Sequence, residues 1–360
     1  MSWEQTTLDR IIEIKKGKAI TKKDSKAGPY PVILGGREPA YYIDQFNHTG
    51  KAIVVSRSGA SAGYVSFWNE AIFVTDGFLV EPKEKVDIDY LYYLMKSHEE
   101  ELMGLQGGSA IPHVTPKIIG SIDVSLPDMN VQVKTANMIK CYDELIRNNQ
   151  KQIKLLEEAA QRLYKEWFVD LRFPGYESVK IVDGTPQGWG KELIGDIIGK
   201  IPRSKQIKTS EYLSDGLIPV IDQSKEFIAG YTNDKESLVD VGKPVIVFGD
   251  HTRILKYIQF PFAKGADGTQ LIVSNRNNMP QALLYLSLIE VDLSNYHYAR
   301  HFKYLKAESI LIPPEKIAKK FDELVSPMLG QIQKLRDICS NLAQARDRLL
   351  PKLMSGEIEV

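Results

Sequence analysis

Basic side chains that could bind phosphates gather in two stretches of the sequence. The first stretch contains one acidic residue, Asp24, and six lysines: Lys15, Lys16, Lys18, Lys22, Lys23 and Lys26. The second has no acidic residue among its basic ones: Lys200, Arg203, Lys205 and Lys208. Lysine and arginine in loops neutralise DNA phosphates and release counterions, which gives affinity independent of base sequence. A solubilising loop is the alternative for either stretch, but the recurrence favours DNA contact.

Two further loops place an arginine among short side chains. They are SRSGASAG at 56–63 and GDHTR at 249–253. Arg57 and Arg253 could each make a bidentate contact to guanine, and small neighbours would allow close approach to a groove. Ordinary turns also use glycine and serine, so this signal is modest. The segments before the two long helical patterns, 106–113 and 298–303, differ from each other, which suits two readers with different targets.

These patterns together predict DNA contacts in both halves of the chain. The predicted residues are Lys16, Lys18, Lys22, Lys23, Arg57, Ser58, Arg203, Lys205, Lys208, His251, Arg253, Arg300 and Lys303.

Catalytic signatures are missing from the sequence. There is no G-x-x-x-x-G-K-[ST] phosphate loop, no H-E-x-x-H zinc motif and no [DN]-P-P-[FY] run, which amino-methyltransferases use to hold an extruded base. His297 and His301 stand four apart, as two metal ligands on a helix could, but no third ligand is near. Asp250 and His251 invite a catalytic-dyad interpretation, yet no nucleophile motif accompanies them, so a polar turn is favoured. We expect no catalytic residue, no metal site and no cofactor.

The overall composition bounds the class of protein. The chain has 360 residues, with 46 basic and 46 acidic ones, a length that allows two or three domains. Zero net charge argues against a histone-like protein or a polybasic membrane binder, but not against a reader with local basic patches. Cys141 and Cys339, without a CxxC spacing, favour a reducing cytoplasm over a disulfide scaffold. No apolar run approaches 18 residues and residues 1–10 lack a signal core, so we expect no membrane span.

Two halves of the chain repeat at an offset of 186 residues. Trp3 and Trp189 open the similar strings WEQTTLDRII and WGKELIGDII, and Pro127 and Pro313 close the strings VSLP and ILIP. The dipeptide RL recurs at 162 and 348, again at the same offset. Three anchors at one spacing indicate an internal repeat.

Each half begins with short apolar runs and ends with a long helical pattern. The runs predicted as strands, separated by turn residues, are 52–56, 64–67, 71–74, 244–248, 257–260 and 271–273. A helix without internal proline or glycine is expected from Met129 to Phe173, stopped by Pro174 and Gly175.

Apolar residues in both helical patterns alternate at spacings of three and four, the heptad of a coiled coil. The expected seam residues are Ile139, Ile146, Asn149, Ile153, Leu156, Leu163, Ile332, Leu335, Cys339, Leu342 and Leu349. Asn149 would help to fix the register at some cost in stability, and Arg346 is a misfit in the second seam. Because both helices lie in one chain, we expect them to pack on each other; separate packing on each domain is the alternative.

Several longer strings make the sequence resemble the specificity (S) subunit of a type I restriction-modification enzyme, over nearly the whole chain. They are the two tryptophan strings, PVILGG at 31–36, and TDG at 75–77 facing ADGTQ at 266–270. The most characteristic are AQRLYKEWFVD at 160–170 and RLLPKLMSGEI at 348–358.

The resemblance implies an α+β fold, in which two similar mixed α/β target recognition domains are joined by two long antiparallel coiled-coil helices with a pseudo-two-fold repeat. The implied parts are recognition domain 1 (1–127), a central helix (128–173), recognition domain 2 (174–313) and a C-terminal helix (314–360). Each recognition domain would read one half of a split, asymmetric DNA target. The helices would set the gap and dock two methyltransferase (M) subunits, which restriction (R) subunits join. S-adenosylmethionine, ATP and Mg would belong to those partners.

Two other classes stay open from the residues alone. A DNA methyltransferase with degenerate motifs would bind S-adenosylmethionine by itself. A coiled-coil adaptor without DNA specificity would leave no footprint on DNA, even together with its partner subunits.

Overall fold

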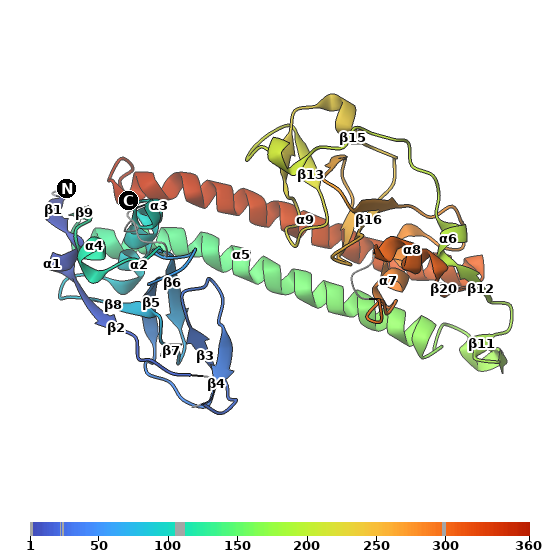
Figure 1. Ribbon diagram of the computed structural model, residues 1–360, viewed down its shortest axis with the longest axis horizontal. Helices are drawn as coiled ribbons and strands as arrows, with labels where there is room; N and C mark the ends of the chain where they lie inside the picture. Colours follow the sequence, from blue (N-terminus) through green and yellow to red (C-terminus); the bar gives the residue numbers. More distant parts are fainter. Residues whose placement is uncertain (1–2, 22, 24, 105–111, 297–299) are drawn as a thin grey trace. The chain divides into compact units, whose positions relative to one another are not determined.

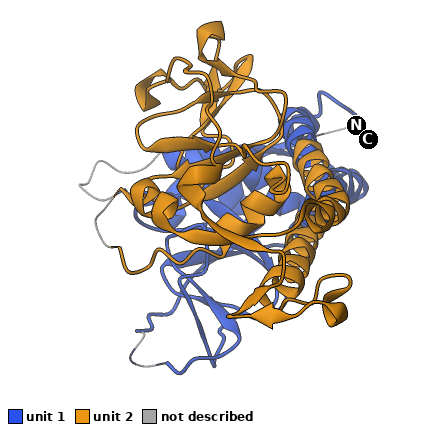
Figure 2. Cartoon of the chain, turned by 90° about the vertical axis from the view of Figure 1, so that its right-hand side faces the viewer, with its two compact units in different colours: residues 1–148, 339–360 blue, residues 149–338 orange. Residues whose placement is uncertain are grey.

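The computed structural model describes all residues except 1–2, 22, 24, 105–111 and 297–299. The chain divides into unit 1, residues 1–148 and 339–360, and unit 2, residues 149–338 (Figure 2). This division cuts both long helices, α5 (Met129–Tyr164) and α9 (Glu315–Met354). Across the described residues, no helix combines the length and apolar character that a membrane span needs.

Unit 1 contains two sheets and a separate strand pair (Figure 1). The antiparallel sheet has the order β2 (Ile12–Lys16), β8 (Gly77–Pro82), β5 (Lys51–Ser56) and β6 (Val65–Asn69). The mixed sheet has the order β4 (Tyr41–Ile43), β3 (Tyr30–Ile33) and β7 (Phe73–Val74), with β3 and β7 parallel. The pair is β1 (Glu4–Thr7) with β9 (Asp123–Leu126).

The described residues of unit 1 form four short helices: α1 (Leu8–Ile11), α2 (Ile88–Ser97), α3 (Glu99–Gly104) and α4 (Pro116–Gly120). The carboxylate of Asp87 accepts from the N–H of Tyr90 at 2.9 Å, which caps the start of α2. The hydroxyl of Thr115 accepts from the N–H of Ile118 at 3.3 Å and does the same for α4. Side-chain caps of this kind satisfy N–H groups that a helix leaves without internal partners.

Unit 2 also combines two sheets with separate strand pairs, but the numbers and lengths of its strands differ from those of unit 1. One sheet has the order β17 (Leu255–Ile258), β16 (Val245–Gly249) and β19 (Thr269–Ile272). The other has the order β14 (Gly230–Thr232), β13 (Ile218–Ile221), β18 (Phe262–Lys264) and β15 (Leu238–Val239), with β13 and β18 parallel. Two pairs complete the strands: β12 (Gly190–Leu193) with β20 (Ser309–Ile312), and β10 (Ile181–Val182) with β11 (Thr185–Pro186).

The helices of unit 2 are short apart from the long pair. They are α6 (Ile194–Ile197), α7 (Gln281–Ile289), α8 (His301–Ala307) and the 3-10 turns Tyr176–Ser178, Thr209–Glu211 and Lys235–Ser237. A π-helical turn, Lys165–Val169, continues α5. Helical structure therefore ends four residues before the predicted end at Phe173, because Leu171 takes a left-handed conformation (φ 58°).

The internal repeat is visible in the strand register. Glu4 pairs with Leu126 in β1–β9, and Gly190 pairs with Ile312 in β12–β20, so both partners shift by 186. The starts of α1 and α6, at Leu8 and Ile194, differ by the same number, as do the starts of α5 and α9. The mixed α/β fold class with long helices is confirmed, and the frame of each half follows the repeat.

Each unit buries apolar residues from both long helices in its core. The core of unit 1 takes Ile139 from α5 and Leu353 from α9. The core of unit 2 takes Trp167 from the π turn that continues α5, and Phe321 and Ile332 from α9. Full burial of such side chains contributes roughly 1.5–3 kcal/mol each, so the helices are part of both cores.

The long helices run antiparallel within each unit. In unit 1 the guanidinium of Arg346 lies 2.6 Å from the carboxylate of Asp143. In unit 2 the guanidinium of Arg336 lies 2.8 Å from the carboxylate of Glu157. The predicted seam residues are all buried or half-buried, and Asn149 is 9% exposed. Arg346, the misfit in the heptad, is accommodated because Asp143 faces it.

Candidate nucleic-acid interface

The arginine loop of unit 1 is held by one carboxylate. The side chain of Asp76, between β7 and β8, accepts a hydrogen bond from the hydroxyl of Ser58 and lies 3.6 Å from the guanidinium of Arg57. The N–H of Arg57 also donates to the carbonyl of Asp76 at 3.3 Å. The Arg57 side chain remains 42% exposed. Asp76 thus fixes the base of the loop while the guanidinium can still reach a ligand.

The arginine loop of unit 2 is held in another way. Arg253 has a left-handed backbone (φ 62°), and its guanidinium donates to the carbonyl of Leu293 at 3.0 Å. Asp250 is 4% exposed, and its carboxylate accepts from the N–H of Phe302 at 2.8 Å, near the start of α8. Asp250 therefore has a structural contact in a polar turn. His251 is exposed, and its N–H donates to the side-chain oxygen of Gln223 at 3.0 Å.

The first basic stretch leaves most of its described lysines exposed. Lys16 ends β2, and Lys18 and Lys23 lie in the connection after it; among the described residues none of the three forms an ion pair. Lys22 lies outside the described residues. Lys15 instead pairs with Glu81 at 2.5 Å, and this hydrogen bond raises the pKa of Lys15.

The second basic stretch is more restrained. Lys205 pairs with Asp234 at 2.5 Å, and the hydrogen bond raises the pKa of Lys205 and lowers that of Asp234. Arg203 and Lys208 have exposed side chains. A lysine that is already matched by a carboxylate loses that partner when it binds phosphate, so Lys205 should contribute less to DNA affinity than Lys16 or Lys18.

The segment at the start of α8 carries the remaining predicted contacts. Arg300, just before the helix, and Lys303, within it, are both exposed. His301 is 5% exposed, and its two ring nitrogens lie 2.9 Å from the carbonyl oxygens of Asp250 and Tyr296. His297 lies outside the described residues, and among the described ones no group of three or more His, Cys, Asp and Glu side chains could hold a metal ion.

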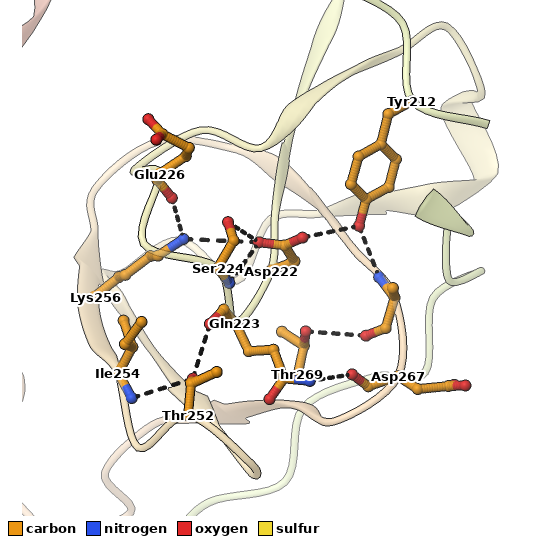
Figure 3. Close-up of polar contacts among 11 residues, drawn as sticks. Tyr212, Asp222, Gln223, Ser224, Glu226, Thr252, Ile254, Lys256, Asp267 and Thr269 are labelled. Carbon is orange, nitrogen blue, oxygen red and sulfur yellow. Dashed lines mark hydrogen bonds and ion pairs between the residues drawn. The ribbon is translucent and has the colours of Figure 1, made fainter. Parts of the chain in front are cut away.

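Sequence patterns missed the polar residues that hold the loops. Asp76 lies in the TDG string, but nothing there shows that it meets Ser58, 18 residues away. Unit 2 contains a larger network around Asp222, Gln223 and Lys256 (Figure 3). Lys256 lies on β17 with only 4% of its side chain exposed, and this burial lowers its pKa. The position of Lys256 among apolar residues of β17 is the sequence feature that could have indicated this network.

Comparison with known proteins gives these loops a context. Residues 1–158 match the family model described as the type I restriction modification DNA specificity domain. The chain is 28% identical to the MjaIX type I restriction enzyme specificity subunit of Methanocaldococcus jannaschii, over 86% of this chain and 78% of that protein. A putative type I specificity subunit of Mycoplasma genitalium is 24% identical over 100% of this chain and 95% of its own.

These matches identify residues 1–158 as a type I restriction modification DNA specificity domain, and the chain is similar over nearly its whole length to type I specificity subunits. A crystal structure of a type I restriction-modification S subunit from M. genitalium has the same fold. Its TM-score is 0.66 at 19% identity, covering 98% of this chain and 96% of that one. The first repeat therefore carries a DNA specificity domain, as the family model describes, and the arginine loops of the two units are the candidate DNA contacts.

Proposed function

We propose that each recognition domain reads one half of a split, asymmetric DNA target. The main support for this proposal is that the strand register is repeated in the two units, whereas the contacts of the arginine loops differ. The register of β1–β9 recurs in β12–β20 at a constant offset, whereas Arg57 contacts Asp76 and Arg253 contacts the Leu293 carbonyl. Two copies of one scaffold with different contact loops support two unlike half-sites.

In this proposal phosphate contacts come from the exposed basic residues, and base contacts come from the arginine loops. Phosphate contacts fix position without specifying sequence, whereas guanine can accept two hydrogen bonds from one guanidinium. Arg57 suits the second role because it is exposed and weakly held at 3.6 Å. The helices α5 and α9 would set the gap between half-sites, because each runs from one unit into the other.

The long helices also offer a surface for a partner that binds twice. Met138 on α5 and Leu324 on α9 are equivalent under the 186-residue repeat, and they are 40% and 47% exposed. Lys134 and Lys320, one helical turn earlier, are also equivalent and exposed. Such a recurring lysine and apolar pair supports docking of two copies of one subunit.

We assign this pair to the two M subunits of a type I complex, which R subunits then join. Residues around the pair differ between the units: Val133 in unit 1 corresponds to Lys319 in unit 2. The shared pair is therefore the part of each helix that one partner could recognise twice. The chain itself would hold no cofactor and act in the cytoplasm, while S-adenosylmethionine, ATP and Mg would be bound by the partners.

Sequencing of methylated sites tests the proposed function. Cells that express the chain with its M subunit should methylate sites with two short specified segments around an unspecified gap. Expression of either protein alone should leave those sites unmethylated. Binding of S-adenosylmethionine by the purified chain, or methylation by it alone, would instead favour a methyltransferase.

A further inference from the structure

One amide side chain in unit 2 links three loops that are distant in sequence (Figure 3). Gln223 comes shortly after β13, and its side-chain N–H donates to the carbonyl of Asp267 at 2.8 Å. Its side-chain oxygen accepts from the N–H of His251 at 3.0 Å, and its main-chain carbonyl accepts from the hydroxyl of Thr252 at 2.8 Å. The side-chain nitrogen of Gln223 thus binds the loop of Asp267, and its side-chain oxygen binds the loop of His251.

The loops around Gln223 approach each other too closely for ordinary side chains. Gly268 has a left-handed backbone (φ +83°), and a Cβ atom there would lie 2.7 Å from the Gln223 amide nitrogen and 2.8 Å from a ring carbon of His251. Such distances are shorter than real Cβ contacts, so any other residue would push Gln223 and His251 away. Glycine at position 268 therefore allows the loop of Asp267 to lie against Gln223 and His251.

The neighbouring residue, Asp222, is itself fixed by several polar contacts. Asp222 is 8% exposed, and its carboxylate accepts from the hydroxyl of Ser224 at 2.6 Å and from that of Tyr212 at 3.3 Å. The amino group of Lys256 lies 3.9 Å from the same carboxylate and donates to the carbonyl of Glu226. Figure 3 shows these contacts on one side of Gln223 and the loop of Thr252 on the other.

We propose that Gln223 is a positioning residue for base recognition by unit 2. Its amide holds the loop of His251 and Arg253 against the loop of Asp267, so that the loop meets DNA in one conformation. A contact group that is fixed beforehand loses less freedom on binding and discriminates better between bases. This inference rests on the proposed function, because it concerns the half-site that unit 2 would read.

The test compares Gln223→Met and Gln223→Glu with Gln259→Met in the full chain with its M subunit. Methionine has a similar length but neither hydrogen bond, and glutamate keeps the acceptor for His251 while losing the donor to Asp267. Gln259 is the matched control, because its side chain donates one hydrogen bond to the carbonyl of Leu329 at 2.8 Å, within unit 2 but in another network. The readout is the base preference at every position of the methylated sites.

Gln223→Met should lower the preference for the correct base about tenfold at one or more positions of one half-site, which is within the usual range for one base pair. Gln223→Glu should relax the same half-site. The other half-site should stay unchanged, as should both half-sites in Gln259→Met. Equal relaxation of both half-sites, or unchanged preferences in active Gln223→Met, would overturn the proposal.

Hydrogen exchange gives a second readout that does not need activity. The amide of His251 should exchange at least about tenfold faster in Gln223→Met than in the native chain, and not in Gln259→Met. Unchanged protection would overturn the proposal even if the variant proved inactive. If the native chain with its M subunit methylated no split site, the proposed function would fail instead, whatever the exchange showed.

Discussion

The two units build the same frame but hold their contact loops with different chemistry. In unit 1 a charged carboxylate, Asp76, contacts both Arg57 and Ser58. In unit 2 the equivalent acidic residue, Asp267, accepts a hydrogen bond through its main-chain carbonyl, and the donor, the neutral amide of Gln223, joins the loops. Core packing therefore keeps the strand register the same in both units, whereas the contacts within the loops can change with the DNA target.

The strands next to these loops, half-buried β6 in unit 1 and buried β17 in unit 2, also differ in their polar contacts. Ser66 on β6 donates to the carbonyl of Val54 at 3.2 Å and accepts from the indole of Trp68 at 3.0 Å. Lys256 occupies the corresponding antiparallel strand of unit 2, β17, and its amino group reaches Asp222 and Glu226. A buried lysine needs nearby oxygen atoms, so unit 2 requires a larger polar network than unit 1.

Insertions in α5 should have the largest effect, because they change the spacing and the relative rotation of the two recognition domains. Four residues added between Gln150 and Glu157 would lengthen the helix by about 6 Å and rotate the rest of the helix by a net ~40°. One base pair advances about 3.4 Å and turns roughly 35°, so the gap should widen by one pair, or at most two. Two added residues would rotate unit 2 by about 200° and abolish recognition.

The measurement for these insertions is the methylated site of each variant with its M subunit. Both half-site sequences should stay the same in the four-residue variant. An unchanged gap, or an altered half-site, would show that α5 does not set the spacing.

A negative charge introduced at Met138 or at Leu324 should weaken docking of an M subunit at that site and leave the other site intact. Met138→Glu and Leu324→Glu should each weaken one of two M-subunit binding events by about thirtyfold, as loss of an interface anchor of about 2 kcal/mol does. The double variant should bind neither copy. Titration calorimetry and mass measurement of the complex give the stoichiometry, and Glu144→Ala, on the same helix, serves as an exposed control. Two M subunits bound to the double variant with native affinity would refute this docking surface.

Removal of the carboxylate charge should affect the two recognition loops unequally. Asp76→Asn loses the charged partner of Arg57 and Ser58, and should relax one half-site about tenfold, since hydrogen bonds to charged groups contribute about 1.5–3 kcal/mol. Asp267→Asn should leave the other half-site unchanged, because its carboxylate makes no hydrogen bond or ion pair among the described residues. Base preferences from methylated sites check both. Relaxation by Asp267→Asn alone would reverse the comparison.

Lysine substitutions should give the smallest and least specific effects. Combined Lys16→Ala and Lys18→Ala should reduce the slope of log K against log salt by roughly 0.9 for each phosphate that is no longer neutralised. Lys205→Ala should change the slope less, because Asp234 already neutralises that lysine. Binding to native and scrambled DNA over a range of salt concentrations measures both quantities. A change confined to native DNA would mean that these lysines read bases.

Sequence patterns could predict the frame because its determinants are local or repeated. Apolar spacing predicted the long helices, and Pro174 predicted a stop, although the left-handed Leu171 ends the helical structure earlier. The loop contacts were harder to predict from the sequence, because their partners are distant along the chain. Gln223 contacts His251, 28 residues later, and Lys205 contacts Asp234, 29 residues later. Such side-chain contacts depend on how strands bring loops together, which spacing alone does not encode.

Recognition of one half-site by each unit is tested most directly by the set of sites that the complete complex methylates in cells. The Asp76→Asn and Gln223→Met variants are compared side by side. We predict a target of two specified segments around an unspecified gap, in which the two substitutions relax different segments. A continuous target, or relaxation of the same segment by both substitutions, would contradict the claim that each unit reads one half-site.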